Sequence, residues 1–422
     1  MRIKKLELKN FRGFEDLTID FPEGESGLAV FVGVNGSGKT SVLEGIVRTL
    51  KVVTDGLQPN SRDNFDTWMN EDDIRLVAHQ LGSRTTFERQ STYSLETLIK
   101  WDSKEIEWHF EQSGGNNEQI REAYSEKRRQ VQSGKPVELP IVSYYKSSRF
   151  WSNEKIKDIG LYPIGSRLDT YIDCLDSKVN SKVIYEWFKR MEFIHFQRKG
   201  EIPPELEAVK DALSIGLEFI LNTPFGSRVY FSGELDELLV SNGKGSYFPF
   251  RLLSEGFRNT IGLIGDIAYR TAELNPHIRT DTSGIVIIDD IDLHLHPSWQ
   301  RKVVPTLRHI FPNIQFILTT HSPQVISTLH KENVFILDNF HLVKETPHTY
   351  GRDSNSILYD IFGVEKRPAE AKEEFSKLYR LMDDPEKVDE TASLLQDVEA
   401  KYGYYDEEVV RARGQFQFLN EA

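Results

Sequence analysis

An eight-residue segment from Gly33 to Thr40 carries the pattern of a phosphate-binding loop. It reads Gly-Val-Asn-Gly-Ser-Gly-Lys-Thr and matches G-x-x-x-x-G-K-[ST] at every fixed position. Its glycines let the backbone curl so that successive N–H groups point at phosphate oxygens. Lys39 would then place its ammonium group on the β- and γ-phosphates, and the Thr40 hydroxyl group would ligate Mg²⁺. The pattern therefore predicts a site for a nucleoside triphosphate with magnesium.

The segments on either side of this loop favour the same interpretation. Residues 28–32 form a short apolar run that suits a buried strand, and apolar side chains then recur at helical spacing from Val42 to Leu50. The loop thus opens a helix, whose N-terminal N–H groups favour anions. A glycine-rich turn with a chance lysine is the alternative, and the strand–loop–helix context makes it the weaker one.

Two carboxylates follow a second apolar run far downstream. Residues 284–289 read GIVIID, which predicts a buried parallel strand that delivers Asp289 to the carboxyl edge of a sheet. Asp290 follows at once. We expect one carboxylate to hold the magnesium shell and the next to orient or deprotonate the attacking water. A polar strand end without function is the alternative, which the loop at Lys39 disfavours.

A histidine stands at the end of another apolar run. Residues 314–318 predict a strand, and His321 follows it after two threonines. Its ring could hydrogen-bond the γ-phosphate or the attacking water. A lone histidine at a strand end is usually structural, but the position of His321 shortly after Asp289 favours a functional role.

The segment from Ser254 to Gly256 could form a second phosphate cradle. Ser254 is a good N-cap for a helix with Phe257 and Ile261 on one face. A serine hydroxyl group and helix N-terminal N–H groups beside a glycine suit an anion. The segment would not reach a nucleotide held by its own loop, so a second copy of the chain would have to supply it. A capped helix and nothing more is the alternative.

The composition is that of an ordinary globular protein. The chain has 422 residues, of which 39% are hydrophobic and 28% charged, and it is long enough for two or three domains. Its single cysteine excludes an internal disulfide and suits a reducing cytosol. Because the sequence has no apolar run of about 18 residues, we expect a cytoplasmic protein without a membrane partner. The net charge of −13 argues against a uniformly basic nucleic-acid binder.

The order of these segments resembles the ABC-type ATPases, specifically the branch of the SMC, RecF and OLD proteins. Residues 33–40 are similar to Walker A, 253–256 to the LSxG signature, 285–290 to Walker B and 320–322 to the switch histidine, while residues 3–14 resemble the N-terminal strand and turn of the branch. The run Asp-Asp-Ile-Asp-Leu-His-Leu-His-Pro at 289–297 is similar to the defence ATPases of the Septu system, called PtuA, which also occur beside some retrons. The segments 353–358 and 362–364 are in keeping with that group.

The resemblance implies an α/β fold, an ABC-type P-loop ATPase head with a mixed central sheet flanked by an antiparallel sheet. We expect a discontinuous head over residues 1–345, a helical lid inserted at about 112–228, and a C-terminal helical docking segment over 346–422. Residues 84–110 alternate like strands of the flanking sheet. No sustained heptad repeat predicts the long coiled coil of SMC proteins.

The resemblance also implies ATP and Mg²⁺ as cofactors, held in a nucleotide-sandwich homodimer or a higher oligomer. The catalytic residues would be Lys39, Asp290 and His321, and the magnesium ligands would be Thr40 and Asp289. The residues expected to contact the nucleotide are Gly33, Val34, Asn35, Gly36, Ser37, Gly38, Lys39, Thr40, Ser41, Arg12, Ser254, Glu255 and Gly256.

One position departs from the pattern of the family. The residue after the Walker B aspartate is normally glutamate, and here it is Asp290. Because aspartate is one methylene shorter, its carboxylate would fall about 1 Å short of the water, and such a misplacement can cost on the order of 100-fold in rate. We therefore expect slow hydrolysis, with ATP serving largely as a conformational switch.

Three weaker patterns have bland alternatives. The basic clusters 127–129, 189–190 and 198–199 could contact DNA, although a solvated helix surface is the stronger interpretation. His294 and His296 have metal-like spacing, but a turn after Walker B explains them better. Asp290-Ile291-Asp292 is similar to the DxD of a Toprim nuclease, which needs a parallel sheet of its own. Only 84 residues follow Asp338, and they look mostly helical, so we expect no nuclease domain in this chain.

Three functions stay open at this point. The favoured one is an ATPase subunit of an antiphage complex that controls a separate HNH nuclease, like PtuB of the Septu system. Its further candidate partners are DNA or RNA and a retron reverse transcriptase with its msDNA. The others are a RecF-like DNA repair ATPase and a non-hydrolysing nucleotide sensor. A neighbouring HNH gene would distinguish the first from the second, and the effect of Asp290→Ala on phosphate release would distinguish the first from the third.

Overall fold

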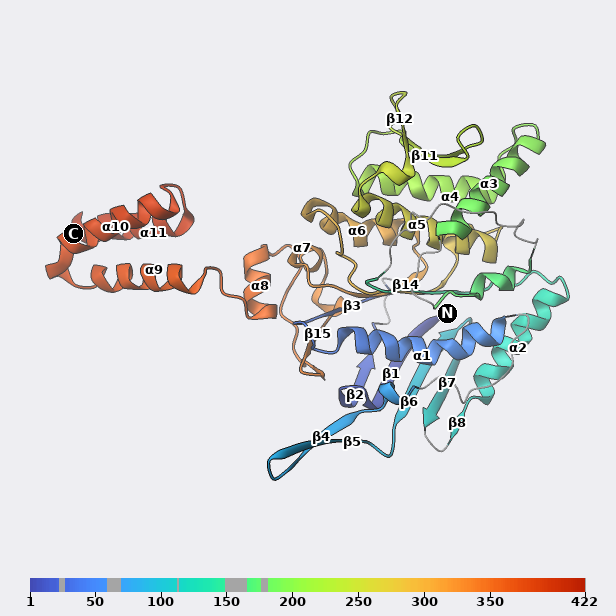
Figure 1. The fold of residues 1–422 in the computed structure, drawn as a ribbon, viewed down its shortest axis with the longest axis horizontal. Coiled ribbons are helices and arrows are strands. Elements are labelled where there is room, and N and C mark those ends of the chain that lie inside the picture. Colours follow the sequence, from blue (N-terminus) through green and yellow to red (C-terminus); the bar gives the residue numbers. More distant parts are fainter. Residues whose placement is uncertain (23–26, 59–69, 112–113, 149–164, 176–180, 422) are drawn as a thin grey trace. The chain divides into compact units, whose positions relative to one another are not determined.

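The computed structural model describes residues 1–22, 27–58, 70–111, 114–148, 165–175 and 181–421. These residues divide into two compact units, Met1–Ile357 and Leu358–Ala422. The first unit contains all the predicted nucleotide-binding segments and is built around two sheets (Figure 1). None of the described helices combines the length and the apolar character that crossing a membrane would need.

The central sheet of the first unit is mixed, and its core is parallel. Its strand order is β16-β15-β3-β14-β13-β9, with only β16 antiparallel. Every residue of β3, β9, β13 and β14 is buried, because both faces are covered, and this explains why their sequences are mostly apolar. The strands are β3 (Leu28–Val32), β9 (Ile141–Tyr145), β13 (Gly284–Ile288), β14 (Ile314–Thr319), β15 (Val334–Asp338) and β16 (His341–Leu342).

A second, antiparallel sheet flanks the first, as predicted. Helix α1 (Lys39–Leu57) lies between the two sheets (Figure 1), so close to β1 that a Cβ atom at Gly45 would lie 3.0 Å from the Leu8 side chain. The sheet has the order β2-β1-β6-β7-β8. Its strands are β1 (Arg2–Phe11), β2 (Phe14–Asp20), β6 (Ser94–Trp101), β7 (Lys104–Glu111) and β8 (Gly114–Asn116). The predicted fold, an ABC-type head with a mixed sheet and a flanking antiparallel sheet, is thereby confirmed.

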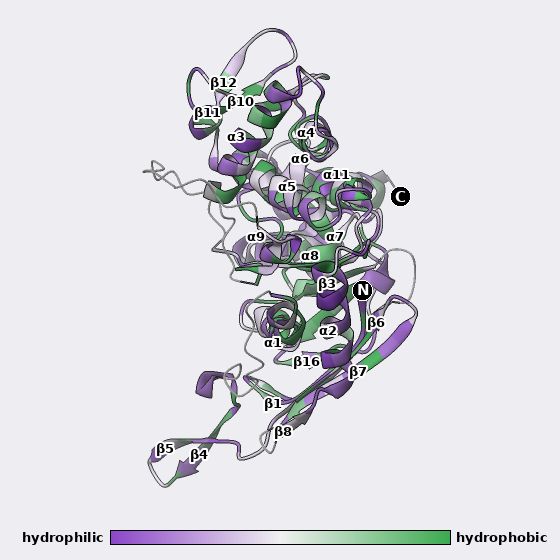
Figure 2. Cartoon of the chain, turned by 90° about the vertical axis from the view of Figure 1, so that its right-hand side faces the viewer, coloured by the Kyte–Doolittle hydropathy of each residue, from purple (hydrophilic) through white to green (hydrophobic). Residues whose placement is uncertain are grey.

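One of the strands expected in the flanking sheet lies elsewhere. Among the described strands, β5 (Arg84–Arg89) pairs with β4 (Leu76–Leu81) alone, and the two form a separate hairpin. Both views show this hairpin projecting from the sheets (Figures 1 and 2). The apolar side chains of Leu81 and Phe87 are 68% and 65% exposed. Alternation within a strand identifies a strand but does not identify its partner, which is why the sequence assigned β5 to the larger sheet.

The region expected as one helical insertion, residues 112–228, is not continuous. Its middle contributes β9, the edge strand of the central sheet, so that the described helices fall on both sides of a core element. The helical centre predicted within 112–135 and the helix predicted over 204–222 are confirmed over residues 118–132 and 204–215. Of the helix predicted over 168–199, residues 181–197 are helical, residues 167–171 form a short 3-10 segment, and residues 176–180 lie outside the described part of the chain. The helices are α2 (Glu118–Gln132), α3 (Ser181–Gln197) and α4 (Pro204–Ile215), and the following strands are β10 (Arg228–Ser232), β11 (Glu237–Ser241) and β12 (Tyr247–Pro249).

A buried ion pair anchors α5 (Glu255–Leu274), the helix that follows Ser254. Arg270 donates to Asp266 at 2.8 Å, and the two side chains are only 8% and 2% exposed. Tyr145 of β9 donates its hydroxyl group to the same carboxylate at 2.6 Å, and Arg270 also donates to the carbonyl oxygen of Thr170. Because the charges satisfy each other inside the protein, the loss of either partner would leave an unpaired buried charge. The contacts hold α5 to the edge of the central sheet.

The second unit is a small helical bundle with a core of its own. Its three helices are α9 (Ala369–Met382), α10 (Val388–Tyr402) and α11 (Glu407–Glu421), preceded by the end of α8 (Ser354–Phe362). The core is formed by Phe375, Leu378, Met382, Leu395, Val398, Val409 and Ala412. Other apolar side chains are left outside it: Tyr405 is 89% exposed and Phe418 is 73% exposed.

Candidate functional site

The loop between β3 and α1 requires glycine at three positions, at all three for the backbone angle and at two also for lack of space. Gly33, Gly36 and Gly38 all have positive φ angles, of 152°, 83° and 106°. A Cβ atom at Gly33 would lie 2.2 Å from the carbonyl oxygen of Leu337, and one at Gly38 would lie 2.7 Å from the Phe14 ring. Side chains are therefore excluded at Gly33 and Gly38 and disfavoured by the positive φ at Gly36, so the backbone is free to approach a phosphate closely.

An aromatic side chain outside the motif supports this loop from below. Phe340, in the turn between β15 and β16, packs edge-on against Phe14 with ring centroids 5.3 Å apart. Its N–H group donates to the carbonyl oxygen of Ser37 at 3.1 Å. The ring would lie 2.3 Å from a Cβ atom at Gly13 and 2.8 Å from one at Gly38. Phe340 itself has a φ of 61°, a conformation that bulky residues rarely adopt, so the packing must hold the backbone there.

Lys39 and Ser37 are two polar side chains of the loop that could donate hydrogen bonds to a phosphate. Lys39 is 5% exposed, and its ammonium group donates to the carbonyl oxygens of Gly33 and Val34 at 3.1 and 2.9 Å. Burial lowers its pKa, while the charges of nearby aspartates oppose the shift. The hydroxyl oxygen of Ser37 is buried and has no hydrogen-bond partner within the described ranges. A cradle of this kind fits a triphosphate, whose oxygens accept several hydrogen bonds.

Asp289 lies at the end of β13, against the first turn of α1. Its two carboxylate oxygens accept from the Thr40 hydroxyl group at 3.2 and 3.1 Å, and the side chain is 3% exposed. Thr319, at the end of β14, donates to the same carboxylate at 2.6 Å. Carboxylate and hydroxyl oxygens are ligands that Mg²⁺ prefers. The residues present therefore fit a magnesium ion held between α1 and β13.

Asp290 and His321 share the electrostatic environment of Lys39. Burial raises the pKa of Asp290, and the charges of Asp289 and Asp292 raise it further. Burial, followed by the charge of Lys39, lowers the pKa of His321, which favours a neutral ring at pH 7. The structure thus brings together the residues that the sequence predicted from three separate segments.

The segment at Ser254 lies at the N-terminus of α5, as predicted. Ser254 occupies the N-cap position, yet its side chain makes no capping hydrogen bond and is exposed. A Cβ atom at Gly256 would lie 2.2 Å from the carbonyl oxygen of His294, and Glu255 lies 3.8 Å from the His294 ring. The segment therefore contacts the loop that follows Asp289, and its serine hydroxyl group is not used by its own helix.

Arg12 has a partner that the sequence did not suggest. Its guanidinium group makes two contacts with the Asp73 carboxylate, at 2.9 and 3.0 Å, and Arg48 of α1 contacts the same carboxylate at 2.9 Å. Asp73 is 1% exposed. Arg12, expected to contact the nucleotide, here neutralises a buried charge together with Arg48. A pairing between residues so far apart in the chain leaves no local pattern to detect.

Several basic residues proposed as DNA contacts are engaged within the protein. Lys127 forms an ion pair with Asp102 at 2.8 Å, and Arg128 donates to the carbonyl oxygen of Gly56. Lys189 forms an ion pair with Asp236 at 2.7 Å. These contacts favour the bland interpretation of the clusters at 127–129 and 189–190.

Within the described ranges, the histidines after Asp289 do not belong to a cluster of side chains that could bind a metal ion. Those ranges hold no group of three or more His, Cys, Asp or Glu side chains suited to a metal ion. The Nδ1 atom of His296 instead caps α6 (Pro297–Ile310) by accepting from the Ser298 N–H group.

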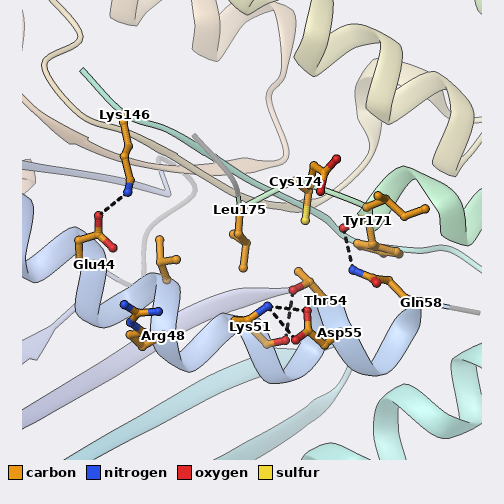
Figure 3. A pocket seen from close by; sticks show the side chains of 13 residues that line it. Glu44, Arg48, Lys51, Thr54, Asp55, Gln58, Lys146, Tyr171, Cys174 and Leu175 are labelled. Carbon is orange, nitrogen blue, oxygen red and sulfur yellow. Dashed lines mark hydrogen bonds and ion pairs between the residues drawn. The ribbon is translucent and has the colours of Figure 1, made fainter. Parts of the chain in front are cut away.

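A separate cavity of about 510 Å³ lies along α1, beyond its first turn (Figure 3). Charged side chains of opposite sign pair along its wall: Lys146 with Glu44 at 3.1 Å, and Lys51 with Asp55 at 2.8 Å. Lys39 and Thr40 are not among its lining residues. The cavity is therefore distinct from the phosphate cradle, and its balanced charges favour no one class of ligand.

We expect the packing of the Phe340 ring to stabilise the fold by more than the strain of its positive φ destabilises it. Phe340→Ala should lower the free energy of unfolding by about 2 kcal/mol, since half-buried aromatic packing is lost. Phe340→Gly should be about 1 kcal/mol more stable than Phe340→Ala, because glycine adopts the positive φ without strain. Urea denaturation of the three proteins measures both differences. A glycine variant less stable than the alanine variant would contradict this account.

Comparison with known proteins agrees with the geometry. The chain is 27% identical to the Septu protein PtuA of Bacillus thuringiensis, over 89% of this chain and 88% of that protein. It is 25% identical to the "Retron Vc95 probable ATPase" of Vibrio cholerae and 27% identical to the "Retron Ec83 probable ATPase" of Escherichia coli. These alignments cover 85% and 88% of this chain, respectively, and 78% of each relative.

Among solved structures, the SMC head domain of Thermotoga maritima aligns with 82% of this chain and 100% of its own, at 16% identity and a TM-score of 0.46. The profile of the family described as "AAA domain, putative AbiEii toxin, Type IV TA system" matches residues 28–327, which is well over half of the chain. That range includes the phosphate-binding loop, Ser254, Asp289 and His321. The chain therefore belongs to this family of AAA domains.

Proposed function

We propose that the chain is an ATP-hydrolysing subunit of a bacterial antiphage defence complex. The observation that carries the proposal is the convergence of Lys39, Thr40, Asp289, Asp290 and His321 at one end of the central sheet. The similarity to Septu and retron ATPases over most of the chain supports the defence context.

Each of these residues has a task that its position suits. The loop N–H groups and Lys39 bind the phosphates, and Lys39 exchanges its present carbonyl partners for phosphate oxygens. Thr40 and Asp289 would hold magnesium, which would supply positive charge beside the phosphates. Asp290 orients the attacking water and accepts its proton, and the neutral ring of His321 hydrogen-bonds the γ-phosphate.

We further propose that a second copy of the chain completes the site. Ser254 is exposed at a helix N-terminus, and its hydroxyl group makes no capping bond. Those features suit a serine that donates to the γ-phosphate bound by another protomer, in a nucleotide sandwich. ATP then joins two chains, and hydrolysis releases them.

Two substitutions should separate binding from assembly. Lys39→Ala should weaken ATP binding at least about 30-fold, since removing a charge that faces a buried phosphate costs about 2–5 kcal/mol. Ser254→Glu should leave binding to the monomer within a few-fold but abolish ATP-dependent dimerisation, because its carboxylate repels the γ-phosphate. Calorimetry measures the first effect and analytical ultracentrifugation the second.

Ser246→Glu is the matched control, because Ser246 is also exposed but lies in the turn before β12. It should dimerise like the unchanged protein. ATP-dependent dimerisation of Ser254→Glu would contradict the sandwich arrangement.

Asp290 accounts for the slow hydrolysis that we propose. Its φ of 47° is one that aspartate tolerates better than most residues, so the short side chain suits the backbone even though it limits reach. Asp290→Glu should raise the rate of phosphate release about 10- to 100-fold by moving the carboxylate about 1 Å closer to the water. Asp290→Asn should bind ATP and release almost no phosphate.

Single-turnover phosphate release measures these rates. Turnover of tens per second in the unchanged protein would contradict slow hydrolysis. Equal rates for the unchanged protein and Asp290→Asn would favour the non-hydrolysing sensor.

The second unit is our candidate for docking an HNH nuclease. Its helices form a core without the head, and they leave Tyr405 and Phe418 exposed. Deletion of residues 366–422 should abolish capture of a co-expressed HNH nuclease from the same locus, while ATP affinity stays within a few-fold. Retained capture after the deletion would refute the docking role. Tyr405→Ser with Phe418→Ser tests the same surface in a chain that keeps its core.

A further inference from the structure

Thr319 is a buried hydroxyl residue at the centre of the site that the motifs do not include. It ends β14, which pairs in parallel with β13 on one side and β3 on the other. Its relative exposure is 0%. The strand order therefore places this side chain beside Asp289, between the Walker B strand and the strand that leads to the phosphate loop.

The Thr319 hydroxyl group both donates and accepts a hydrogen bond, and its partners are the consecutive residues Asp289 and Asp290. It donates to the Asp289 carboxylate at 2.6 Å and accepts from the Asp290 N–H group at 2.7 Å. The carbonyl oxygen of Thr319 also accepts from the Ile291 N–H group at 3.0 Å. Among the small side chains, only serine could make the same two hydroxyl contacts.

These contacts fix the orientation of one side chain and the backbone conformation of the next residue. The bond to Asp289 sets the rotation of the carboxylate, so that it meets Thr40 of α1. The bond from the Asp290 N–H group holds the positive φ of Asp290, which turns the chain sharply after the strand. A residue that orients a metal-binding carboxylate in this way controls the metal site without touching the ion.

Thr320, the next residue, makes a similar pair of hydrogen bonds: its hydroxyl group also donates to a carboxylate and accepts from a backbone N–H group. Thr320 is also fully buried; its hydroxyl group donates to Asp292 at 2.5 Å and accepts from the Ser322 N–H group at 3.0 Å. The end of β14 is thus a pair of threonines that hold successive parts of the loop after Asp289. Of these two threonines, Thr319 is the one whose hydroxyl group contacts Asp289, the proposed magnesium ligand.

We propose that Thr319 is a positioning residue that sets the orientation of Asp289 toward magnesium and of Asp290 toward the attacking water. The proposal rests on the function proposed above. It goes beyond that function because Thr319 is assigned control of the metal site, without direct contact with nucleotide or metal.

The test compares Thr319→Val and Thr319→Ser with Thr271→Val. Valine keeps the shape of threonine and removes the hydroxyl group, whereas serine retains it. Thr271 is the matched control: it is 0% exposed, and its hydroxyl group donates only within α5, to the Ala268 carbonyl oxygen at 2.9 Å. The readouts are ATP affinity in EDTA by calorimetry and the affinity of the ATP complex for Mn²⁺ by electron paramagnetic resonance.

Thr319→Val should bind ATP in EDTA within about threefold of the unchanged protein but lose about 10- to 100-fold in Mn²⁺ affinity. Thr319→Ser and Thr271→Val should keep Mn²⁺ affinity within about threefold. Equal Mn²⁺ affinity in Thr319→Val and Thr271→Val would overturn the proposal and leave the proposed function intact.

An unchanged protein that takes up neither ATP nor Mn²⁺ would overturn both proposals. If Thr319→Val does not fold, Thr319→Ala gives the same comparison, since it removes the hydroxyl group and leaves space for water. Its Mn²⁺ affinity must then fall as well, and an undiminished value would count against the assignment.

Discussion

The parallel register of β3, β14 and β13 is the constraint on which the rest of the structure depends. Parallel strands end at a common edge, so a single sheet delivers the phosphate loop, His321 and Asp289 to one place from distant parts of the chain. The strands are buried on both faces, and their order cannot change without exposing the core. Every contact proposed for ATP assumes this edge.

The positions of the site residues at the sheet edge are fixed by side-chain contacts between neighbouring strand ends, in addition to the pairing of the strands. Thr40 and Thr319 bind Asp289 from two sides, and Phe340 packs beneath Gly38. Each contact joins residues that are far apart in sequence. Together they explain how a glycine-rich loop, which is flexible as a peptide, has one defined conformation here.

The sequence predicted the parts of the site that depend on local pattern. The loop at Lys39 and the strand before Asp289 could be identified because a short run of residues determines each of them. Thr319 gave no such signal, since a threonine in an apolar run reads simply as a strand residue. The pairing of Arg12 with Asp73 and the place of β5 in its own hairpin depend on contacts between distant segments, which periodicity does not encode.

The close approach of Gly256 to His294 links two surfaces that, in the proposed sandwich, would contact different nucleotides. His294 belongs to the loop that starts at Asp289, and Gly256 belongs to the first turn of α5, beside Ser254. With backbone against backbone, neither segment can shift while the other stays in place. In the proposed two-fold assembly, a shift of the loop after Asp289 beside one ATP would move Ser254 beside the other, so that the two ATP molecules would not be hydrolysed independently.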